Sequence, residues 1–391
     1  SQSGAYGSHA FALLRARGVD TGIMITTGNE ADVDLADAIG YLVRDETTRV
    51  IVAYAEGIRD GDALRSALAE AAAAGKPVIF MKVGRSQVGA AAAASHTAAL
   101  AGSDRVYDGL FAQYGVMRVD STDQLLDAAQ IASRGLFPDG DRLGLISISG
   151  GVGVQMADAA EDCGLSVPEM PEDAQRELKE LLPFAAVRNP VDITAQAFND
   201  LTLIGKNLTL MLEKGGYDVV VAFFTVVAGS RAIAEPLIRI LTEARASYPD
   251  RAMILSLVAT PEIVRQYEDA GYPVYEDPTR AVAAAASVMR FGRFFARPAE
   301  PAPPAVPAGA PSVPAAMLAE HEATDLLEAW GVPFVARRLA KTADEAAAAA
   351  ETIGGRVVLK IASADIQHKT EVGGVIVGVE GADAVRAAHT R

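Results

Sequence analysis

The sequence has little cysteine, few aromatic residues and a deficit of positive charge. Its single cysteine excludes an intrachain disulfide, and with five scattered histidines it cannot build a zinc cluster. The 35 basic residues face 50 acidic ones, and the net charge of −15 argues against binding nucleic acid, whose phosphates would be repelled. We find neither a signal peptide nor an apolar run of membrane-spanning length, so we expect a cytoplasmic protein without a membrane partner.

Buried strands and amphipathic helices alternate through most of the chain. Short apolar runs at 21–26, 50–54 and 77–83 are separated by helical patterns, and residues 142–297 repeat the arrangement. Continuous apolar strands between helices are typical of parallel sheets covered on both faces. We therefore predict an α/β fold with two doubly wound parallel-sheet domains in tandem, over 1–135 and 142–297.

A proline-rich stretch separates these domains from a third unit. Residues 298–316 contain seven of the nineteen prolines, which predicts an extended, semi-rigid linker. Residues 317–391 then read as the start of an α+β domain, with helices over 316–330 and 343–353 and strands at 332–335, 356–361 and 375–379. The chain begins without a methionine and stops inside a helical pattern, so we expect both ends to be trimmed.

Two Ser-Gly turns stand directly before a predicted helix. They contain Ser3, Gly4 and Ala5 in the first domain, and Ser149, Gly150, Gly151 and Gly153 in the second. The first amides of such a helix, together with its dipole, form an anion site. The alternative is a tight turn with serine as the helix N-cap. Two matching turns suggest an internal duplication whose helices aim at one phosphate.

His96 lies in a run of alanine and glycine, "GAAAAASHTAALAGS", that offers nothing bulky to bury the ring. A loop of small residues can present a neutral imidazole, which is a good nucleophile toward phosphorus. The alternative is a histidine on a helix surface. Glu56 follows an apolar strand, where its carboxylate can orient such an imidazole or merely cap the next helix.

The third unit offers two further candidates. Lys360 ends an apolar strand, where a lysine can hold nucleotide phosphates or simply be solvated. His368 lies in a polar loop before two glycines, and we interpret it as an ordinary loop residue when it is taken alone. The remaining histidines, His9, His321 and His389, receive no role.

Several spaced motifs together resemble the ADP-forming acyl-CoA synthetases, relatives of succinyl-CoA synthetase. The resemblance rests on "SQSGAYG", "GNEADVDLADAIGYL", "AEGIRDG", "GRSQVGAAAAASHTAALAGS", "NPVDIT" and "VVLKIASADIQHKTEVGGV". It implies flavodoxin-like folds for the first two domains and the opening of an ATP-grasp domain for the third. It also implies an acid–thiol ligase, such as an acetate or hydroxycinnamate enzyme, that uses ATP or ADP, Mg²⁺ and CoA and forms a homo-oligomer.

The resemblance assigns roles residue by residue. His96 matches the phosphohistidine and Glu56 the acid that contacts it, while the helices after the two Ser-Gly turns match a pair that grips the phosphate. Lys360 matches a nucleotide-binding lysine, and His368 a second histidine of the phosphate relay. The chain departs from the family pattern because it lacks the N-terminal CoA-binding domain and most of the ATP-grasp domain, including the acidic magnesium ligands.

Three alternative functions stay open at this level. A non-catalytic, ligand-sensing module of a protein acetyltransferase would keep the fold without the chemistry. A dinucleotide-binding oxidoreductase needs Gly-x-Gly-x-x-Gly, whereas the glycines at 150, 151 and 153 have the wrong spacing. A serine hydrolase needs Gly-x-Ser-x-Gly, whose first glycine is replaced by Ser1. The acyl substrate cannot be deduced from the sequence.

Overall fold

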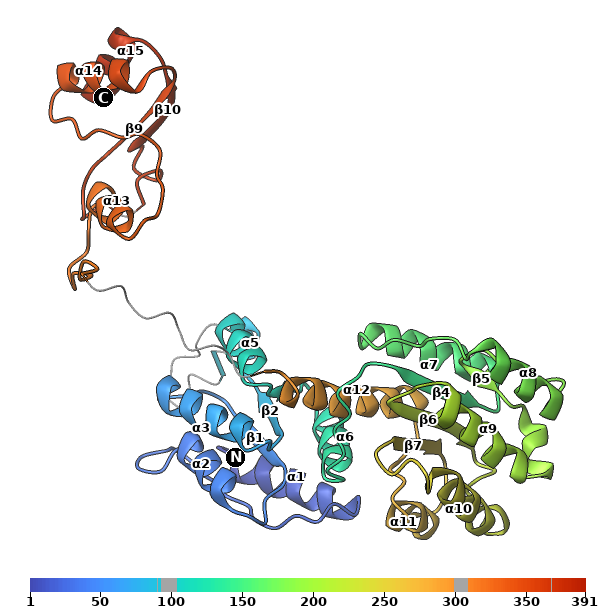
Figure 1. Cartoon of the computed structure of the whole chain (residues 1–391). Helices are drawn as coiled ribbons and strands as arrows, with labels where there is room; N and C mark the ends of the chain where they lie inside the picture. The colour runs from blue at the N-terminus through green and yellow to red at the C-terminus, as the bar shows by residue number, and fades with distance from the viewer. Residues whose placement is uncertain (90, 93–103, 299–308, 367) are drawn as a thin grey trace. The chain divides into compact units, whose positions relative to one another are not determined.

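The computed structural model describes residues 1–89, 91–92, 104–298, 309–366 and 368–391. The chain forms two compact units, Ser1–Pro298 and Ala299–Arg391 (Figure 1). Each unit is described by itself below. His96, the predicted phosphohistidine, lies outside the described residues.

Unit 1 contains two parallel sheets, and we call each sheet with its helices a lobe. The first sheet has the order β1-β2-β3, so β1 lies at an edge. All five residues of β2 are buried, because one face packs against α2, α3 and α5 and the other against α1 and α6. Its elements are α1 (Gly4–Ala16), α2 (Leu35–Arg44), β1 (Ile51–Ala55), α3 (Gly61–Ala73), β2 (Val78–Lys82), α5 (Asp104–Gln113), β3 (Met117–Arg118) and α6 (Thr122–Ala132).

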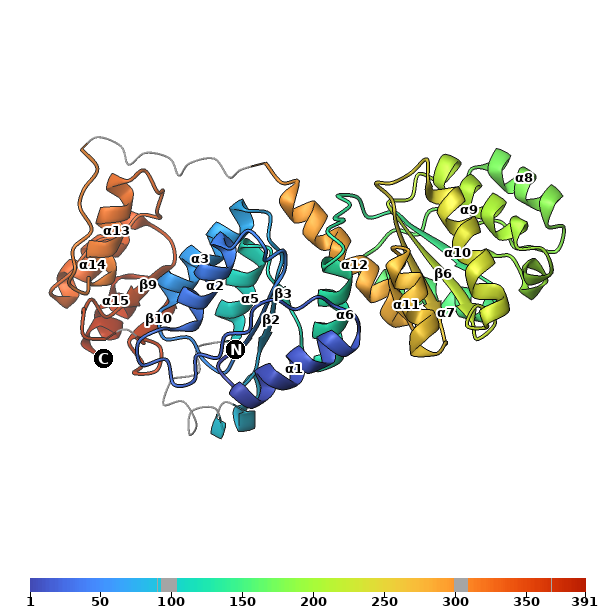
Figure 2. The ribbon, with the colours of Figure 1, turned by 90° about the horizontal axis from the view of Figure 1, so that it is seen from below.

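The second lobe is built on five parallel strands in the order β5-β4-β6-β7-β8. Helices α8 to α11 cover one face, and α7 and α12 cover the other (Figure 2). Its elements are β4 (Leu143–Ser147), α7 (Gly150–Asp162), α8 (Glu172–Leu181), β5 (Val191–Asp192), a 3₁₀ helix (Ala195–Asn199), α9 (Thr202–Lys214), β6 (Val219–Thr225), α10 (Arg231–Arg245), β7 (Ala252–Leu257), α11 (Pro261–Asp269), β8 (Val274–Tyr275) and α12 (Pro278–Phe295).

The two lobes share helix α12. Its residues Val288 and Met289 pack in the second core, whereas Phe291 packs against α6 and the first sheet. A buried carboxylate reinforces the junction, because Asp127 on α6 accepts hydrogen bonds from Arg17 at 2.6 Å and from Arg280 at 2.7 and 2.8 Å. Buried charge pairs of this kind need such complete hydrogen bonding to be tolerated.

Unit 2 is small and partly open. Strands β9 and β10 pair antiparallel, and α14 and α15 pack together beside them over a modest apolar core. Its elements are α13 (Glu320–Ala329), α14 (Ala343–Ile353), β9 (Val357–Lys360), β10 (Val375–Val379) and α15 (Ala382–Thr390).

The predicted α/β class with two parallel sheets is confirmed, but two expected strands do not form. Residues 21–26 are extended but form no strand in the described part of the chain, although the carbonyl of Ile25 accepts from the amino group of Ser1 and the amide of Thr27 donates to the carbonyl of Ser1. Residues 332–335 are irregular, with Val335 86% exposed. An apolar run predicts a strand in both places, whereas a strand also needs a neighbouring strand with which to pair. Among the described residues, no helix has both the length and the apolar character needed to cross a bilayer.

Candidate functional site

The first Ser-Gly turn begins helix α1. Ser3 is the N-cap, with extended backbone, and its hydroxyl accepts a hydrogen bond from the amide of Tyr6 at 3.1 Å. Gly4 and Ala5 are exposed, so the first amides of the helix face solvent at its positive end. The hydroxyl of Ser3 therefore acts as an N-cap, as the alternative interpretation of the turn predicted. The first backbone amides of α1 remain free and can still bind an anion.

Glu56 lies beside this turn, as its strand-end position suggested. Gln2 makes the connection, because its Oε1 accepts from the amide of Glu56 at 2.7 Å and its Nε2 donates to the carbonyl of Gly57 at 2.6 Å. The amide of Gln2 also donates to the carbonyl of Tyr54 at 3.1 Å. Among the described residues, the carboxylate of Glu56 makes no hydrogen bond or ion pair. It is thus left open to a ligand or to a side chain beyond the described set.

Lys82 is a site residue that the sequence reasoning missed. It ends β2, is 2% exposed, and its Nζ donates to the carbonyls of Glu56 at 2.7 Å and Val83 at 2.5 Å. The ring of Tyr107 lies under the ammonium, 5.0 Å away at its centroid. Burial lowers the pKa of Lys82, and the negative charge of Asp104 partly opposes that effect. Lys82 has the same sequence pattern as Lys360, namely a lysine at the end of an apolar strand.

The segment that carries His96 joins β2 to α5, and its described ends flank a cavity of about 410 Å³. Its lining includes Lys82 and Gly84, and also Asp104, the first residue of α5. Arg85 pairs there with Asp120 at 2.5 Å. Since β1 and β2 run parallel, Glu56 and the start of this segment meet at one edge of the sheet.

The second Ser-Gly turn begins helix α7 at the carboxyl end of β4. Ser149 is the N-cap residue, but its hydroxyl makes no cap hydrogen bond, and Gly150 and Gly151 are exposed. Gly153 packs against Pro190, which would meet an added Cβ at 3.2 Å. A carboxylate oxygen of Asp192 lies 3.2 Å from where a Cβ at residue 150 would stand, so a negative group already faces this helix end.

The structure does not bring all of the predicted phosphate-binding residues together. Ser3, Gly4 and Glu56 meet through Gln2, whereas the second turn lies over the other sheet. Within the described part of unit 1, no hydrogen bond or ion pair joins the α1 turn to the α7 turn. The binding of one phosphate by the N-termini of both helices therefore stays a prediction.

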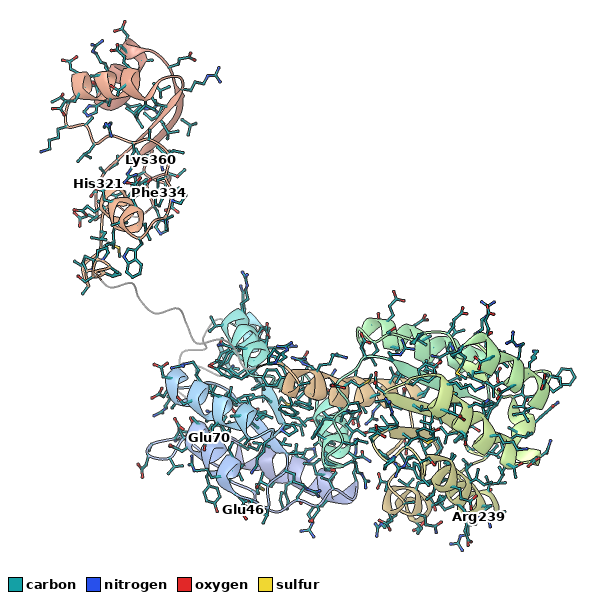
Figure 3. The ribbon with its side chains drawn as sticks, viewed as in Figure 1. Glu46, Glu70, Arg239, His321, Phe334 and Lys360 are labelled. Carbon is teal, nitrogen blue, oxygen red and sulfur yellow. The ribbon has the colours of Figure 1, made fainter. Side chains whose placement is uncertain are left out.

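In unit 2, Lys360 lies against α13 (Figure 3). Its Nζ donates to one carboxylate oxygen of Glu320 at 2.6 Å, and Lys369 donates to the other at 2.7 Å. These two bonds lower the pKa of the Glu320 carboxyl. His368 is exposed in the loop before β10, next to Lys369. Lys360 and the His368 loop are thus connected through Glu320, which sequence reasoning did not single out.

Comparison with known families agrees with this arrangement. Residues 1–132 match the succinyl-CoA ligase like flavodoxin domain, residues 143–290 the ligase-CoA domain and residues 310–391 an ATP-grasp domain. The matched segments coincide with the first lobe, the second lobe and unit 2. The chain also has relatives whose function is named.

Those relatives are similar over most of this chain. An ADP-forming acetate–CoA ligase I of Archaeoglobus fulgidus is 32% identical over 97% of the chain and 55% of its own length. A 4-hydroxybutyrate–CoA ligase (ADP-forming) of Nitrosopumilus maritimus is 31% identical, again over 97% of the chain and 55% of its own length. The chain thus spans about half the length of these two relatives.

A solved structure has the same fold. The dinucleotide forming acetyl-coenzyme A synthetase 1 of Candidatus Korarchaeum cryptofilum, in complex with phosphate and ADP, superposes with a TM-score of 0.66 at 28% identity. The match covers 75% of this chain and 64% of that one. Three family models in order, the curated relatives and this structure agree: the chain belongs to the ADP-forming acyl-CoA synthetase family.

Proposed function

We propose that this protein joins a carboxylic acid to CoA at the expense of ATP, releasing ADP and phosphate, with His96 as the phosphoryl carrier. The observation that supports it most is the meeting of the α1 turn and Glu56 at the sheet edge where β2 leads into the His96 segment. Relatives named for acetate and 4-hydroxybutyrate support a carboxylic acid as the substrate class.

The reaction divides into three transfers. An imidazole nitrogen of His96 attacks the γ-phosphorus of ATP, the bond from that phosphorus to the β,γ-bridging oxygen breaks, and ADP leaves. A carboxylate oxygen of the acid then takes the phosphoryl group, which gives an acyl phosphate and frees the imidazole. The CoA thiolate finally attacks the acyl carbon and expels phosphate. The covalent relay replaces one difficult transfer with easier ones.

The protein contributes position and charge to these transfers. In this proposal Glu56 accepts an N–H from the ring of His96, which fixes the tautomer and stabilises the charged phosphohistidine. The free amides at the start of α1, and those at the start of α7, hold phosphoryl oxygens. Asp192 lies close to the start of α7, so an anion entering there requires a shift of that carboxylate or a counter-charge from the ligand.

The nucleotide side of the reaction belongs to unit 2. Lys360 would bind ADP or ATP phosphates after leaving Glu320, and His368 would assist the transfer of the phosphoryl group from the nucleotide to His96. Magnesium accompanies such nucleotides, but the described residues contain no cluster of acidic, histidine or cysteine side chains that could hold a metal, so we assign it no ligand. We further propose a cytoplasmic homo-oligomer.

Radiolabelling tests the carrier directly. Incubation of the complete protein with [γ-³²P]ATP should leave acid-labile, base-stable label on it, and His96→Asn should remove that label. His389→Asn is the matched control, since that histidine is exposed on α15 and has no proposed role.

Label that persists on the His96 variant would show that another residue carries the phosphoryl group. No label on the complete protein, with the rest of the ATP-grasp domain present, together with small-molecule binding in isothermal titration, would favour the ligand-sensing module instead. A panel of carboxylic acids scored for ADP release with the full-length protein then identifies the acyl substrate.

A further inference from the structure

Strand β3 ends in a short tail, residues 118–120, that carries two opposite charges. Arg118 is the last residue of the strand, and Asp120 follows two positions later. Between them Val119 is 2% exposed, and its amide donates to the carbonyl of Phe80 at 3.0 Å, so the pairing with β2 continues into the tail. Because side chains alternate along an extended chain, Arg118 and Asp120 lie on one face of the tail, about 7 Å apart along the backbone.

Asp120 holds the upstream stem of the segment that carries His96, which we define as residues 83–85. A carboxylate oxygen of Asp120 accepts a hydrogen bond from Nη1 of Arg85 at 2.5 Å. The amide of Asp120 donates to the side chain of Gln124 on α6 at 2.8 Å, which fixes the backbone that carries this carboxylate. Both partners of the ion pair are about half exposed, so the pair adds little to stability. Its main effect is therefore on the position of the upstream stem.

Arg118 holds the downstream stem, residues 104–108 at the start of α5. Its Nη2 donates to Asp104 and its Nη1 donates to Asp108, both at 2.6 Å. The two carboxylates are four positions apart on the helix, so they lie on the same side of its first turn. A single guanidinium group thus fixes the beginning of α5. The side chain of Arg118 is only 13% exposed, so these two ion pairs are better shielded from solvent than the pair of the upstream stem.

Lys82 joins both stems to the strand end that carries Glu56. Its ammonium donates to the carbonyl of Val83 in the upstream stem and to the carbonyl of Glu56. The same ammonium lies over the ring of Tyr107 in the downstream stem. The two ends of the His96 segment, Glu56 and the tail of β3 are therefore parts of one connected framework. Four of its charged residues line the same cavity, namely Lys82, Arg85, Asp104 and Asp120.

We propose that Arg118 and Asp120 are positioning residues for phosphoryl transfer through His96, an inference that rests on the proposed function. By holding both stems against β3, they restrict where His96 can lie relative to Glu56 and the α1 turn. Fixing the two ends of a segment in this way raises the effective concentration of the group that it carries. A rival role, in which Arg85 leaves Asp120 and binds a phosphoryl oxygen itself, makes a different prediction when the two charges are exchanged.

Labelling of the complete protein with [γ-³²P]ATP tests the upstream stem. Arg85→Met and Asp120→Ala should each slow His96 labelling at saturating ATP by about 10-fold, since a misplacement of about 1 Å can cost up to about 100-fold. The double variant Arg85→Asp with Asp120→Arg restores the ion pair with its signs reversed, and should label within about 3-fold of the unmodified protein. The ATP concentration at half-maximal rate should not change, because the proposed nucleotide residues belong to unit 2. The apparent melting temperature should shift by less than about 3 °C.

Arg44→Met is the matched control. Arg44 pairs with Glu70 at 3.1 Å between α2 and α3 of the same lobe, and both side chains are exposed. This variant should label at the unmodified rate. Asp108→Ala tests the downstream stem and should slow labelling by about 3-fold, because Arg118 keeps its bond to Asp104.

Amide hydrogen exchange provides a readout that needs no chemistry. The amide of Val83 donates to the carbonyl of Ala55 at 3.0 Å, and its exchange should become about 10-fold faster in Arg85→Met and in Asp120→Ala. The exchanged pair should restore the slow exchange, and Arg44→Met should leave it unchanged.

Slower labelling in the single variants with recovery in the exchanged pair supports the positioning role. Labelling at the unmodified rate in both single variants would overturn it, and so would an equal slowing in Arg44→Met. Slow labelling that persists in the exchanged pair would make Arg85 a direct ligand of the phosphoryl group and would equally refute the inference. No label on the unmodified complete protein would refute the proposed function and this role with it, even if exchange at Val83 shows that the ion pairs hold the stem.

Discussion

At the scale of single residues, Lys82 is the least expected member of the site. Its ammonium bridges the carbonyls of Glu56 and Val83, which come from the two strand ends that meet there. Lys82→Met would leave both carbonyls without this donor, and we expect a loss of about 1–3 kcal/mol in unfolding free energy. We also expect slower labelling of His96, because the turn that carries Glu56 would be less well held. Urea unfolding and the rate of ³²P incorporation measure the two effects.

Lys76 supplies the matched control for this substitution. Its Nζ donates to the carbonyls of Leu42, Val43 and Asp45, so Lys76→Met removes comparable bonds in the same lobe at a distance from the site. We expect a similar loss of stability and unchanged labelling. If both variants label at the same reduced rate per folded molecule, Lys82 has only a general structural role.

Single residues also show the limit of sequence reasoning. Glu56 could be placed at the site because a strand end is read from an apolar run followed by glycine. Gln2, which connects Glu56 to the α1 turn, could not, since its side-chain hydrogen bonds join residues 54 and 55 positions apart. The same holds for Glu320, whose partners Lys360 and Lys369 are 40 and 49 positions away. Contacts between residues so far apart in the chain depend on the tertiary structure, and the hydrophobic pattern of the sequence does not predict them.

At the scale of elements, the two Ser-Gly turns have the same sequence pattern but different capping. Ser3 caps α1 through its hydroxyl, whereas the hydroxyl of Ser149 makes no cap bond. Ser3→Ala should therefore lower the unfolding free energy by about 1 kcal/mol, and Ser149→Ala by less than about 0.5 kcal/mol. Chemical denaturation of the two variants measures the difference.

The same pair separates capping from ligand binding. A hydroxyl that is free in the absence of ligand can donate to a phosphoryl oxygen, so Ser149→Ala should slow His96 labelling while leaving stability nearly unchanged. Equal losses of stability in the two variants would contradict the assignment of the caps.

Element prediction succeeded where a helix follows its own periodicity, as in α14, and failed at 21–26, where the apolar run lacks neighbouring strands on which to form a ladder.

At the scale of the whole of unit 1, a buried carboxyl group makes the junction of the lobes sensitive to pH. Glu268 on α11 accepts a hydrogen bond from Gln130 on α6 at 2.5 Å, and its backbone carbonyl accepts from Arg134 at 3.0 Å. Burial raises the pKa of Glu268 above its ordinary value of 4.5, although Arg134 opposes this. Below 4.5 the group is protonated in both folded and unfolded chains and has no effect. As the pH rises through its raised pKa, ionisation favours the unfolded chain and stability is lost.

Glu268→Gln should remove the loss of stability that follows from ionisation of this carboxyl group. The variant should be more stable than the unmodified protein at pH 7.5, and the difference should shrink as the pH is lowered toward 4.5. Thermal unfolding across this pH range measures it, with Glu213→Gln as a control because that residue is exposed on α9. A stability difference that stays constant with pH would mean that the carboxyl group is not the cause.

Helix α12 limits how the two lobes of unit 1 can be separated. Phe291 is fully buried against the first sheet, although its helix follows the last strand of the second. A gene cut between residues 132 and 143, where two family models meet, would remove a wall of the first core and uncover Leu125 and Ile79. Recombination that exchanges one lobe for that of another enzyme must carry this helix's contact surface with it. The lobes therefore depend on one another for a complete core, even though each has a sheet of its own.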